Sequence, residues 1–280
     1  MAISFKNIVI VGRQDDPRVK DPLQLLKDHL AKVGATIHTA DAMDKADLVI
    51  AIGGDGTMLY ASRQTRETGT PILGINRGRL GFLADVTPDE MITSLDHVLN
   101  GNYTADSRLM LKARLQRANS GDGDDQVAYA LNDVVLQRRE TGRMVDFQTR
   151  IGGLYVNTHS GDGLIVSTPT GSTAYALSCG GPIIEPQLDA VAIIPICPHT
   201  LTDRPIVISA NQAIEVSLLE RDDTKAEITV DGFSMGNINP NDKLLISAAN
   251  NRVTLLHPPG YDFYEILRSK LFWGRDNRKR

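Results

Sequence analysis

Residues 48–57 read Leu48-Val49-Ile50-Ala51-Ile52-Gly53-Gly54-Asp55-Gly56-Thr57, and they indicate the architecture of the N-terminal part. Its first half, 48–52, is apolar throughout, which is typical of a strand that is buried on both faces in a parallel sheet. Glycines follow at once, and the segment from Tyr60 to about Glu67 has a helical pattern. A buried strand that passes through glycines into a helix is the building unit of doubly wound α/β sheets.

Segments of the same kind lie on both sides of this stretch. Residues 8–11, 35–40 and 71–75 are further strand candidates. Apolar residues recur at helical spacing between the first two, at Leu23, Leu26, Leu30 and Val33. Thr87 and Glu90 form a capping-box pattern ahead of a helix lined by Met91, Leu95 and Val98. We therefore predict a doubly wound α/β domain over residues 1–102.

The periodicity changes near residue 103. Leu109, Leu111, Ala113 and Leu115 alternate with polar residues, which indicates a strand with one wet face. The Gly/Asp/Ser-rich segment 119–125 and the pair Gly152-Gly153 predict hairpins. Further short strands are expected at 191–196, 206–208, 214–218, 226–230, 244–246 and 253–256. This pattern predicts an antiparallel β domain over residues 103–258, so the fold class is α/β plus all-β.

The C-terminal segment 259–280 reads as a closing amphipathic helix. Phe263, Ile266, Leu267 and Leu271 fall on one face of it. We expect this helix to pack back on the N-terminal domain.

The composition excludes several classes of protein. The chain has 280 residues, with 30 basic and 34 acidic side chains and a formal net charge of −4, whereas nucleic-acid binding through phosphates favours a basic excess. No apolar run approaches the length of a membrane span, and the apolar run 8–11 is too short for a signal peptide. The two cysteines, Cys179 and Cys197, argue against a disulfide framework. We expect no nucleic-acid or membrane partner and a cytoplasmic location.

The Gly-Gly-Asp-Gly-Thr motif carries the first chemical signal. The N–H groups of Gly53, Gly54, Gly56 and Thr57, at the start of a helix, are suited to holding phosphate. A carboxylate among them would repel phosphate unless it takes a proton or holds a cation. The segment is neither a Walker A loop nor a dinucleotide-binding GxGxxG motif. The alternative is a tight turn in which Asp55 only caps the helix.

A stretch rich in hydroxyl groups carries the second signal. It reads Thr168-Pro169-Thr170-Gly171-Ser172-Thr173-Ala174-Tyr175 and lies between the glycine-containing segments 161–163 and 180–182. Hydroxyl groups suit ribose, adenine edges and phosphate oxygens, and Tyr175 offers a flat face for a base. An ordinary Ser/Thr-rich turn is the alternative.

A third and weaker signal is Asn132-Asp133, which stands next to the apolar residues 134–136. An adjacent amide and carboxylate supply donors and acceptors together. A helix or turn cap is the alternative explanation.

These motifs resemble the bacterial ATP/polyphosphate NAD kinase family. The resemblance runs from the first strand to the C-terminal helix and is carried by 53–57, 76–83, Asn132-Asp133, 168–175 and 180–182. The GGDG motif alone is shared with diacylglycerol and sphingosine kinases, whereas 168–175 is much more specific. The resemblance implies a two-domain subunit in a homodimer or homotetramer. It also implies transfer of a phosphate from ATP or polyphosphate to the 2′-hydroxyl of the adenosine ribose of NAD.

The resemblance also implies roles for individual residues. Asp55 would activate the ribose hydroxyl, with Gly56 beside it, and Mg²⁺ would arrive with the nucleotide. The other implied NAD-binding positions are Asn132, Asp133, Arg143, Ser160, Asp162, Thr170, Thr173, Ala174, Tyr175, Ala176, Leu177 and Ser178.

The chain departs from the family pattern at three positions. Asp133 stands where Glu is common, and Phe233 stands where a polar residue is common. Ser160 replaces a basic residue of some relatives, which leaves the choice between NAD and NADH open. Two other functions stay as alternatives: a lipid kinase of the related fold, which needs an apolar cleft or membrane-facing surface, and a non-catalytic NAD sensor, which does not need Asp55.

Overall fold

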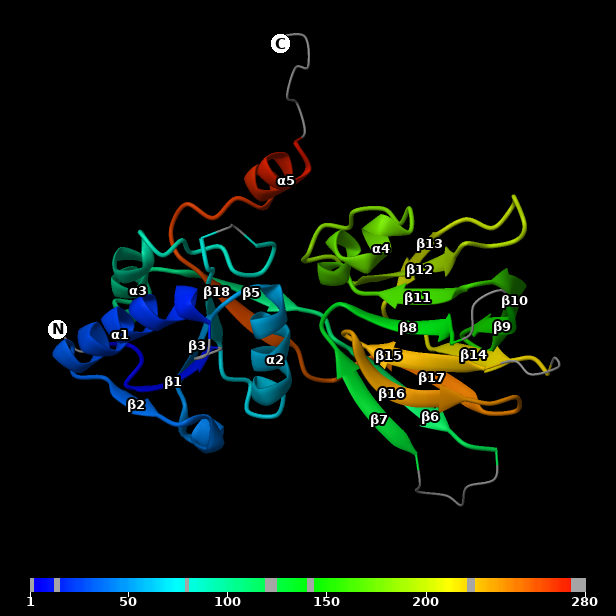
Figure 1. Ribbon diagram of the computed structural model, residues 1–280, viewed down its shortest axis with the longest axis horizontal. Helices are drawn as coiled ribbons and strands as arrows, with labels where there is room; N and C mark the ends of the chain where they lie inside the picture. The colour runs from blue at the N-terminus through cyan, green and yellow to red at the C-terminus, as the bar shows by residue number, and fades with distance from the viewer. Residues whose placement is uncertain are drawn as a thin grey trace, which may run out of the picture. The chain divides into compact units, whose positions relative to one another are not determined.

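The computed structural model describes residues 3–12, 16–78, 81–118, 125–139, 144–220 and 225–272. The chain forms two compact units (Figure 1). Unit 1 contains Met1–Ser107 and Val253–Arg280, and unit 2 contains Arg108–Arg252. The chain therefore leaves unit 1 once and returns to it.

Unit 1 is built on a six-stranded sheet of order β2-β1-β3-β4-β18-β5. The pairs β1–β2, β1–β3, β3–β4 and β4–β18 are all parallel. Strand β3 is buried at every position, as its unbroken apolar sequence predicts. The strands are β1 (Asn7–Gly12), β2 (Thr36–His38), β3 (Leu48–Ile52), β4 (Ile72–Ile75), β5 (Thr104–Arg108) and β18 (Val253–His257).

Helices cover both faces of this sheet. Leu26 of α1 (Pro17–Lys32) and Leu95 of α3 (Met91–Leu99) share an apolar cluster with Ile50 of β3. Helix α2 (Asp55–Thr65) packs on the opposite face, where Met58 reaches Gly74 of β4 so closely that a Cβ there would lie 2.8 Å from its sulfur. The prediction of a doubly wound α/β domain is confirmed. A short 3₁₀ helix, η1 (Ala40–Lys45), follows β2.

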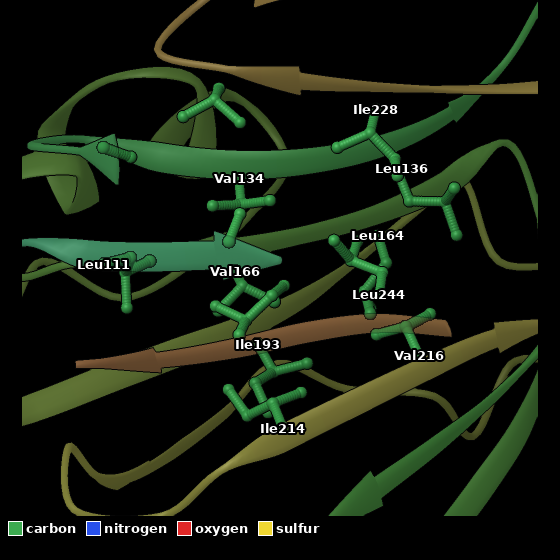
Figure 2. Packing of buried hydrophobic residues seen from close by; sticks show 14 of the residues in the cluster. Leu111, Val134, Leu136, Leu164, Val166, Ile193, Ile214, Val216, Ile228 and Leu244 are labelled. Atoms are coloured by element: carbon green, nitrogen blue, oxygen red, sulfur yellow. The ribbon is translucent and has the colours of Figure 1, made fainter. Parts of the chain in front are cut away.

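Unit 2 contains two six-stranded antiparallel sheets with orders β10-β9-β14-β17-β6-β7 and β13-β12-β11-β8-β15-β16. Side chains from both sheets meet in one apolar core, among them Val134 and Ile228 from one sheet and Val216 and Leu244 from the other (Figure 2). The first sheet contains β6 (Leu111–Gln116), β7 (Gln126–Ala130), β9 (Val145–Ile151), β10 (Leu154–Gly161), β14 (Ile214–Leu218) and β17 (Lys243–Ala248). The second contains β8 (Asp133–Arg138), β11 (Gly163–Ser167), β12 (Ala190–Ile196), β13 (Ile206–Ser209), β15 (Ala226–Val230) and β16 (Phe233–Ile238).

Both predicted hairpins are present. Strands β9 and β10 pair antiparallel, and Gly152 and Gly153 between them have φ of 57° and 82°, which a two-residue hairpin turn of this type requires. Strands β6 and β7 also pair antiparallel, although the turn at 119–124 lies outside the described residues.

The predicted β domain runs to residue 258, whereas unit 2 ends at Arg252 and the segment 253–256 groups with unit 1. Strand β18 pairs parallel with β4, with Leu255 opposite Ile72. The burial of β18 on both faces fits a parallel strand. Its partner β4 lies far away in the sequence, so no local pattern showed that the chain returns to unit 1 at this point. Helix α5 (Phe263–Leu271) follows β18 in unit 1, and the carboxylate of its N-cap, Asp262, accepts a hydrogen bond of 2.8 Å from the N–H of Tyr264.

Candidate functional site

Asp55 is held at the start of α2, directly after β3. The backbone turns through Gly53, whose N–H donates to the carbonyl of Ile75 at 2.8 Å, and the helix begins at Asp55. Both carboxylate oxygens of Asp55 accept backbone N–H bonds, from Phe82 at 3.3 Å and from Leu83 at 3.1 Å. The carboxylate is therefore fixed in place, and it sits where the helix dipole favours a negative charge.

Glycines let the backbone come close to Asp55. A Cβ on Gly81 would lie 2.4 Å from Oδ1 of Asp55, and a Cβ on Gly53 would lie 2.1 Å from Oγ1 of Thr57. No side chain fits at either position without moving its neighbour. Gly53 and Gly81 therefore allow the close backbone packing that places the carboxylate.

A cavity of about 840 Å³ opens beside this turn within unit 1. Gly54, Gly56 and Thr57 line it, together with the cationic side chains of Lys27 and Arg77. Its volume is in the range of nucleotide and cofactor pockets. The remaining lining residues are Ile10, Val11, Gly12, Leu23, Ile37, His38, Thr39, Ala40 and Tyr60.

Arg77 is a site residue that sequence reasoning missed. It forms an ion pair with Asp16, the N-cap of α1, while it lines the cavity. Hydrogen bonds from Arg18, and then from Arg77, hold the pKa of Asp16 well below its usual range. Its place directly after β4 and Asn76 was the available signal, because ligands bind at the carboxyl ends of parallel strands.

In unit 2 the Asn132-Asp133 pair is held by Asp231. The carboxylate of Asp231 accepts from the N–H groups of Leu131, Asn132 and Asp133 at 2.9, 2.8 and 3.2 Å. Asp231 has a positive φ of 49° and is followed by Gly232 with a φ of 76°, so a tight turn aims its side chain back at β8. Asp231 was missed as a site residue, and the Asp-Gly dipeptide was its only local signal.

Asp133 is buried next to Asp231, and the two carboxylates repel each other. Burial, and then the charge of Asp231, raises the pKa of Asp133 to about 7. A carboxyl group that exchanges its proton near neutral pH can accept or donate a hydrogen bond. Asp133 is therefore chemically suited to a ligand hydroxyl.

The raised pKa predicts a pH dependence of stability. The folded pKa lies above the ordinary 3.8, so the stability linked to this group is present below pH 4 and is lost as pH rises to about 7. Asp133→Asn carries no such charge. We therefore expect the free energy of unfolding of Asp133→Asn, relative to that of wild type, to rise by about 1.4 kcal/mol per pH unit between pH 4 and 7. Above pH 7 the difference between the two proteins should stay constant. Urea unfolding of both proteins across this range measures the difference, and parallel curves would contradict it.

The hydroxyl-rich stretch forms a 3₁₀ turn, η2 (Thr170–Thr173), followed by the single helical turn α4 (Tyr175–Ser178). Several hydroxyls expected to face a ligand instead hold the loop together. The hydroxyl of Thr168 donates to the carbonyl of Leu131 at 2.5 Å, and that of Ser172 donates to the carbonyl of Pro169 at 2.6 Å. The Thr168 N–H also donates to the carbonyl of Asn132 at 2.9 Å, so this loop and the Asn132 turn form one structure.

The six positions 173–178 divide by exposure. Tyr175 and Ser178 are exposed, and Thr173, Ala174 and Leu177 are half-buried. Ala176 is buried in an apolar cluster with Ile165 and Ile194, so its side chain belongs to the core. Thr170 is also buried, and its hydroxyl accepts from Arg108 at 3.3 Å.

Ser160 and Asp162 lie at the other end of the β8–β11 pair from Asp133. Asp133 pairs with Ser167, whereas Gln137 pairs with Gly163, next to Asp162. Four residue steps separate these pairs, or about 14 Å along a strand. The structure thus brings Asn132, Asp133 and the 168–172 loop together, and it places Ser160 and Asp162 apart from them.

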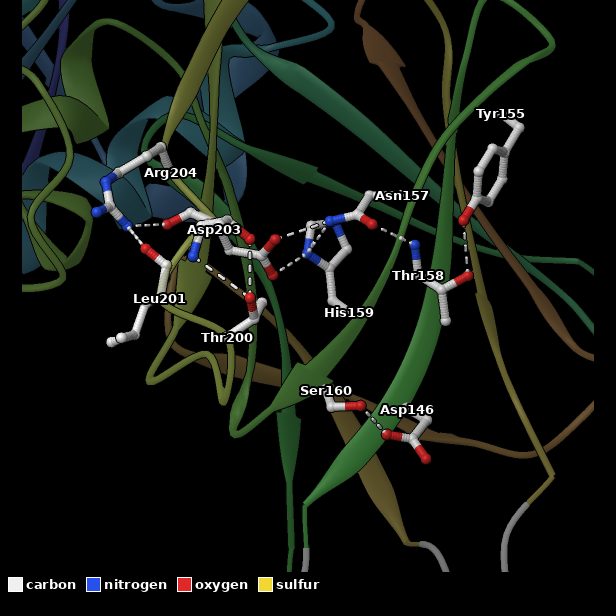
Figure 3. Close-up of polar contacts among 11 residues, drawn as sticks. Asp146, Tyr155, Asn157, Thr158, His159, Ser160, Thr200, Leu201, Asp203 and Arg204 are labelled. Carbon is white, nitrogen blue, oxygen red and sulfur yellow. Dashed lines mark hydrogen bonds and ion pairs between the residues drawn. The ribbon is translucent and has the colours of Figure 1, made fainter.

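Each residue of this second group has a polar partner within unit 2. The guanidinium of Arg138 makes a bidentate contact with the carboxylate of Asp162, with Nε 2.8 Å from Oδ1 and Nη2 3.3 Å from Oδ2. The hydroxyl of Ser160 donates a hydrogen bond to the carboxylate of Asp146. Nearby, Nδ1 of the buried His159 lies 2.9 Å from Oδ2 of Asp203. Figure 3 shows the two side chains facing each other. Arg143 lies outside the described residues.

In the ranges that the structure describes, no three His, Cys, Asp or Glu side chains are grouped to hold a metal ion. No described helix is long and apolar enough to cross a membrane.

Comparisons with known proteins cover both units. A family model described as the ATP-NAD kinase N-terminal domain matches residues 13–103, and one described as the ATP-NAD kinase C-terminal domain matches residues 131–257. The NAD kinase of Nitrosococcus oceani is 40% identical, over 98% of this chain and 99% of that protein. The NAD kinase of Acinetobacter baylyi is 42% identical, over 98% and 94%.

Two solved structures share the fold. The yeast NADH kinase in complex with NADH superposes with a TM-score of 0.91 at 21% identity, over 98% of this chain and 89% of that one. An NAD kinase from Archaeoglobus fulgidus in complex with ATP gives a TM-score of 0.70 at 24% identity, over 95% and 97%. At these identities the likeness establishes the architecture.

Proposed function

The chain belongs to the NAD kinase family, and on this premise we propose that Asp55 activates the 2′-hydroxyl of the adenosine ribose of NAD. The chain is an NAD kinase, which transfers the terminal phosphate of ATP to that hydroxyl and yields NADP. The observation that carries the role of Asp55 is its carboxylate, held by the N–H groups of Phe82 and Leu83 at the head of α2. A fixed base is what an in-line phosphoryl transfer requires.

The proposed chemistry is a single displacement. The ribose 2′-oxygen forms a bond to the γ-phosphorus, the bond to the bridging oxygen breaks, and ADP leaves. Asp55 takes the proton of the hydroxyl. Gly54, Gly56, Thr57 and the cation of Arg77 line the 840 Å³ cavity, and we assign the triphosphate to it.

We propose that unit 2 holds the nucleoside through Asn132, Asp133 and the 168–178 segment. The N–H bonds to Asp231 keep the first two residues in one orientation. Tyr175 is 43% exposed, which leaves its ring available for stacking on a base.

A second copy of the chain is expected to complete the site. Asp162 lies next to Gly163, which is about 14 Å along the β8–β11 pair from Asp133, so Asp133 and Asp162 of one chain lie too far apart to contact the same ring. We propose a homodimer or homotetramer in which Asp162 of one copy meets the nicotinamide side of NAD on another. Sedimentation at several protein concentrations tests this assembly. A cytoplasmic location is likewise proposed.

Mg²⁺ is proposed to enter as its complex with the triphosphate. Mg²⁺ commonly keeps water and substrate phosphates as ligands, and we assign it no protein ligand. When bound, it neutralises charge on the transferring phosphate.

The test is a product assay with purified protein, NAD, ATP and Mg²⁺, in which an NADP-specific dehydrogenase reads the NADP. Parallel reactions contain NADH in place of NAD, or polyphosphate in place of ATP. NADP formation with NAD and ATP is expected. The parallel reactions report the phosphate donor, and the choice between NAD and NADH that Ser160 leaves open. NAD binding without NADP formation under any donor would favour a sensor, and neither binding nor product would favour the lipid kinase.

A further inference from the structure

A short loop, residues 81–86, carries both N–H groups that hold the Asp55 carboxylate. It is tight, since the N–H of Gly81 donates to the carbonyl of Ala84 at 3.0 Å. Its end is tied to β4, where Val86 forms a bridge with Ile75. The position of Asp55 therefore depends on where this loop sits.

Asp85, in the same loop, is hydrogen-bonded to His257 of β18. The Nδ1 of His257, at the end of β18, lies 2.7 Å from Oδ2 of Asp85. A carboxylate only accepts, so Nδ1 carries the hydrogen. The two side chains are 2% and 9% exposed. A hydrogen bond that is shielded from solvent in this way holds its geometry far better than one on the surface.

The imidazole of His257 is itself fixed on two other sides. Its ring stacks on Tyr261 with centroids 3.7 Å apart and an interplanar angle of 11°. Its Nε2 lies 3.5 Å from Oδ2 of the buried Asp106 on β5. These contacts fix the imidazole ring of His257 at the end of β18, and the carboxylate of Asp85 is hydrogen-bonded to that ring.

We infer that His257, acting through Asp85, is a positioning residue for Asp55. The chain of contacts runs from β18 to the 81–86 loop and from its N–H groups to the reacting carboxylate. Loss of the Asp85 contact lets the loop shift, and misplacement of a base by about 1 Å costs up to 10²-fold in rate. The inference rests on the proposed role of Asp55, and it gives a function to His257 and Asp85, which lie outside the motif.

Two substitutions at His257 separate this role from a merely structural one. The side-chain amide nitrogen of Asn reaches the position of Nδ1 and keeps the bond to Asp85, whereas that of Gln reaches the position of Nε2 and does not. Both remove the ring that stacks on Tyr261, so both lose stability to a similar degree. We expect His257→Asn to keep kcat within about threefold, and His257→Gln to lose it about 10- to 100-fold, with KM for NAD nearly unchanged in both.

Two further variants complete the experiment. Asp85→Ala breaks the same contact from the loop and is expected to lower kcat as His257→Gln does. His29→Asn is the matched control, because it removes a histidine–aspartate contact that does not involve the 81–86 loop. In the wild type, Nε2 of His29 on α1 lies 2.7 Å from Oδ1 of Asp96 on α3. The kcat of this variant should stay at the wild-type value. Thermal melting of each variant tracks stability alongside the kinetics.

The outcomes are distinct. Equal kcat for the Asn and Gln variants, or a loss in each variant that follows its melting temperature, would overturn the inference. Asp55→Asn is assayed in parallel. Full activity in that variant would remove the proposed base itself, whereas a normal His257→Gln beside an inactive Asp55→Asn would remove only the role of His257.

Discussion

Asp55→Asn should lower kcat by about 10²-fold or more while leaving KM for NAD nearly unchanged, since it removes a general base but little volume. The amide oxygen of Asn can still accept one of the two backbone N–H bonds, from Phe82 or Leu83, so the turn should keep its shape. The loss would therefore report chemistry rather than folding.

A surface carboxylate gives the control for this change. Asp28, on α1, accepts a hydrogen bond from Gln24 at 2.8 Å and is exposed. Asp28→Asn should leave both kcat and KM unchanged. Steady-state NADP formation at saturating ATP measures both variants, and a kcat of Asp55→Asn within threefold of wild type would contradict the role of Asp55.

Asp231→Ala should cause the largest loss of stability among the changes considered, about 3 to 5 kcal/mol. It removes a buried acceptor that serves three backbone N–H groups, those of Leu131, Asn132 and Asp133. Each buried donor left without its partner costs about 1–3 kcal/mol, and the losses are not fully additive. NAD affinity should fall as well, because these bonds orient Asn132 and Asp133.

Asp231→Asn is the matched variant. Its amide oxygen retains an acceptor, Asn tolerates the positive φ of 49°, and the repulsion of Asp133 is relieved. We expect a loss below about 1.5 kcal/mol. Urea unfolding measures both variants, and equal losses would show that the N–H bonds to Asp231 are not the source of the stability.

Much of the site could be predicted because its signals are local. An apolar strand followed by glycines placed Asp55 at the head of a helix, and the structure confirms β3 and α2 there. Gly152-Gly153 likewise predicted its hairpin correctly, since only a few backbone conformations suit a two-residue turn.

What could not be predicted depends on contacts between distant segments. Asp231 holds Asn132 across 99 positions, and His257 meets Asp85 across 172. Nothing next to these residues in the sequence marks the partner. The same applies to β18, whose apolar pattern fits an antiparallel and a parallel strand equally until its neighbour β4 is known.

The hydroxyl-rich stretch shows a different limit. The sequence indicated many donors and acceptors for a ligand, yet the hydroxyls of Thr168 and Ser172 donate to backbone carbonyls, those of Leu131 and Pro169. Side-chain type gives the hydrogen-bonding capacity, while burial decides whether a ligand or the protein uses it.

The most direct test of the account combines binding and turnover in one preparation of Asp55→Asn. Calorimetric titration with NAD gives Kd, and the same sample with ATP and Mg²⁺ gives the rate of NADP formation. The account predicts an NAD affinity close to that of wild type together with a rate at least about 10²-fold lower. NADP formation at the wild-type rate would contradict it.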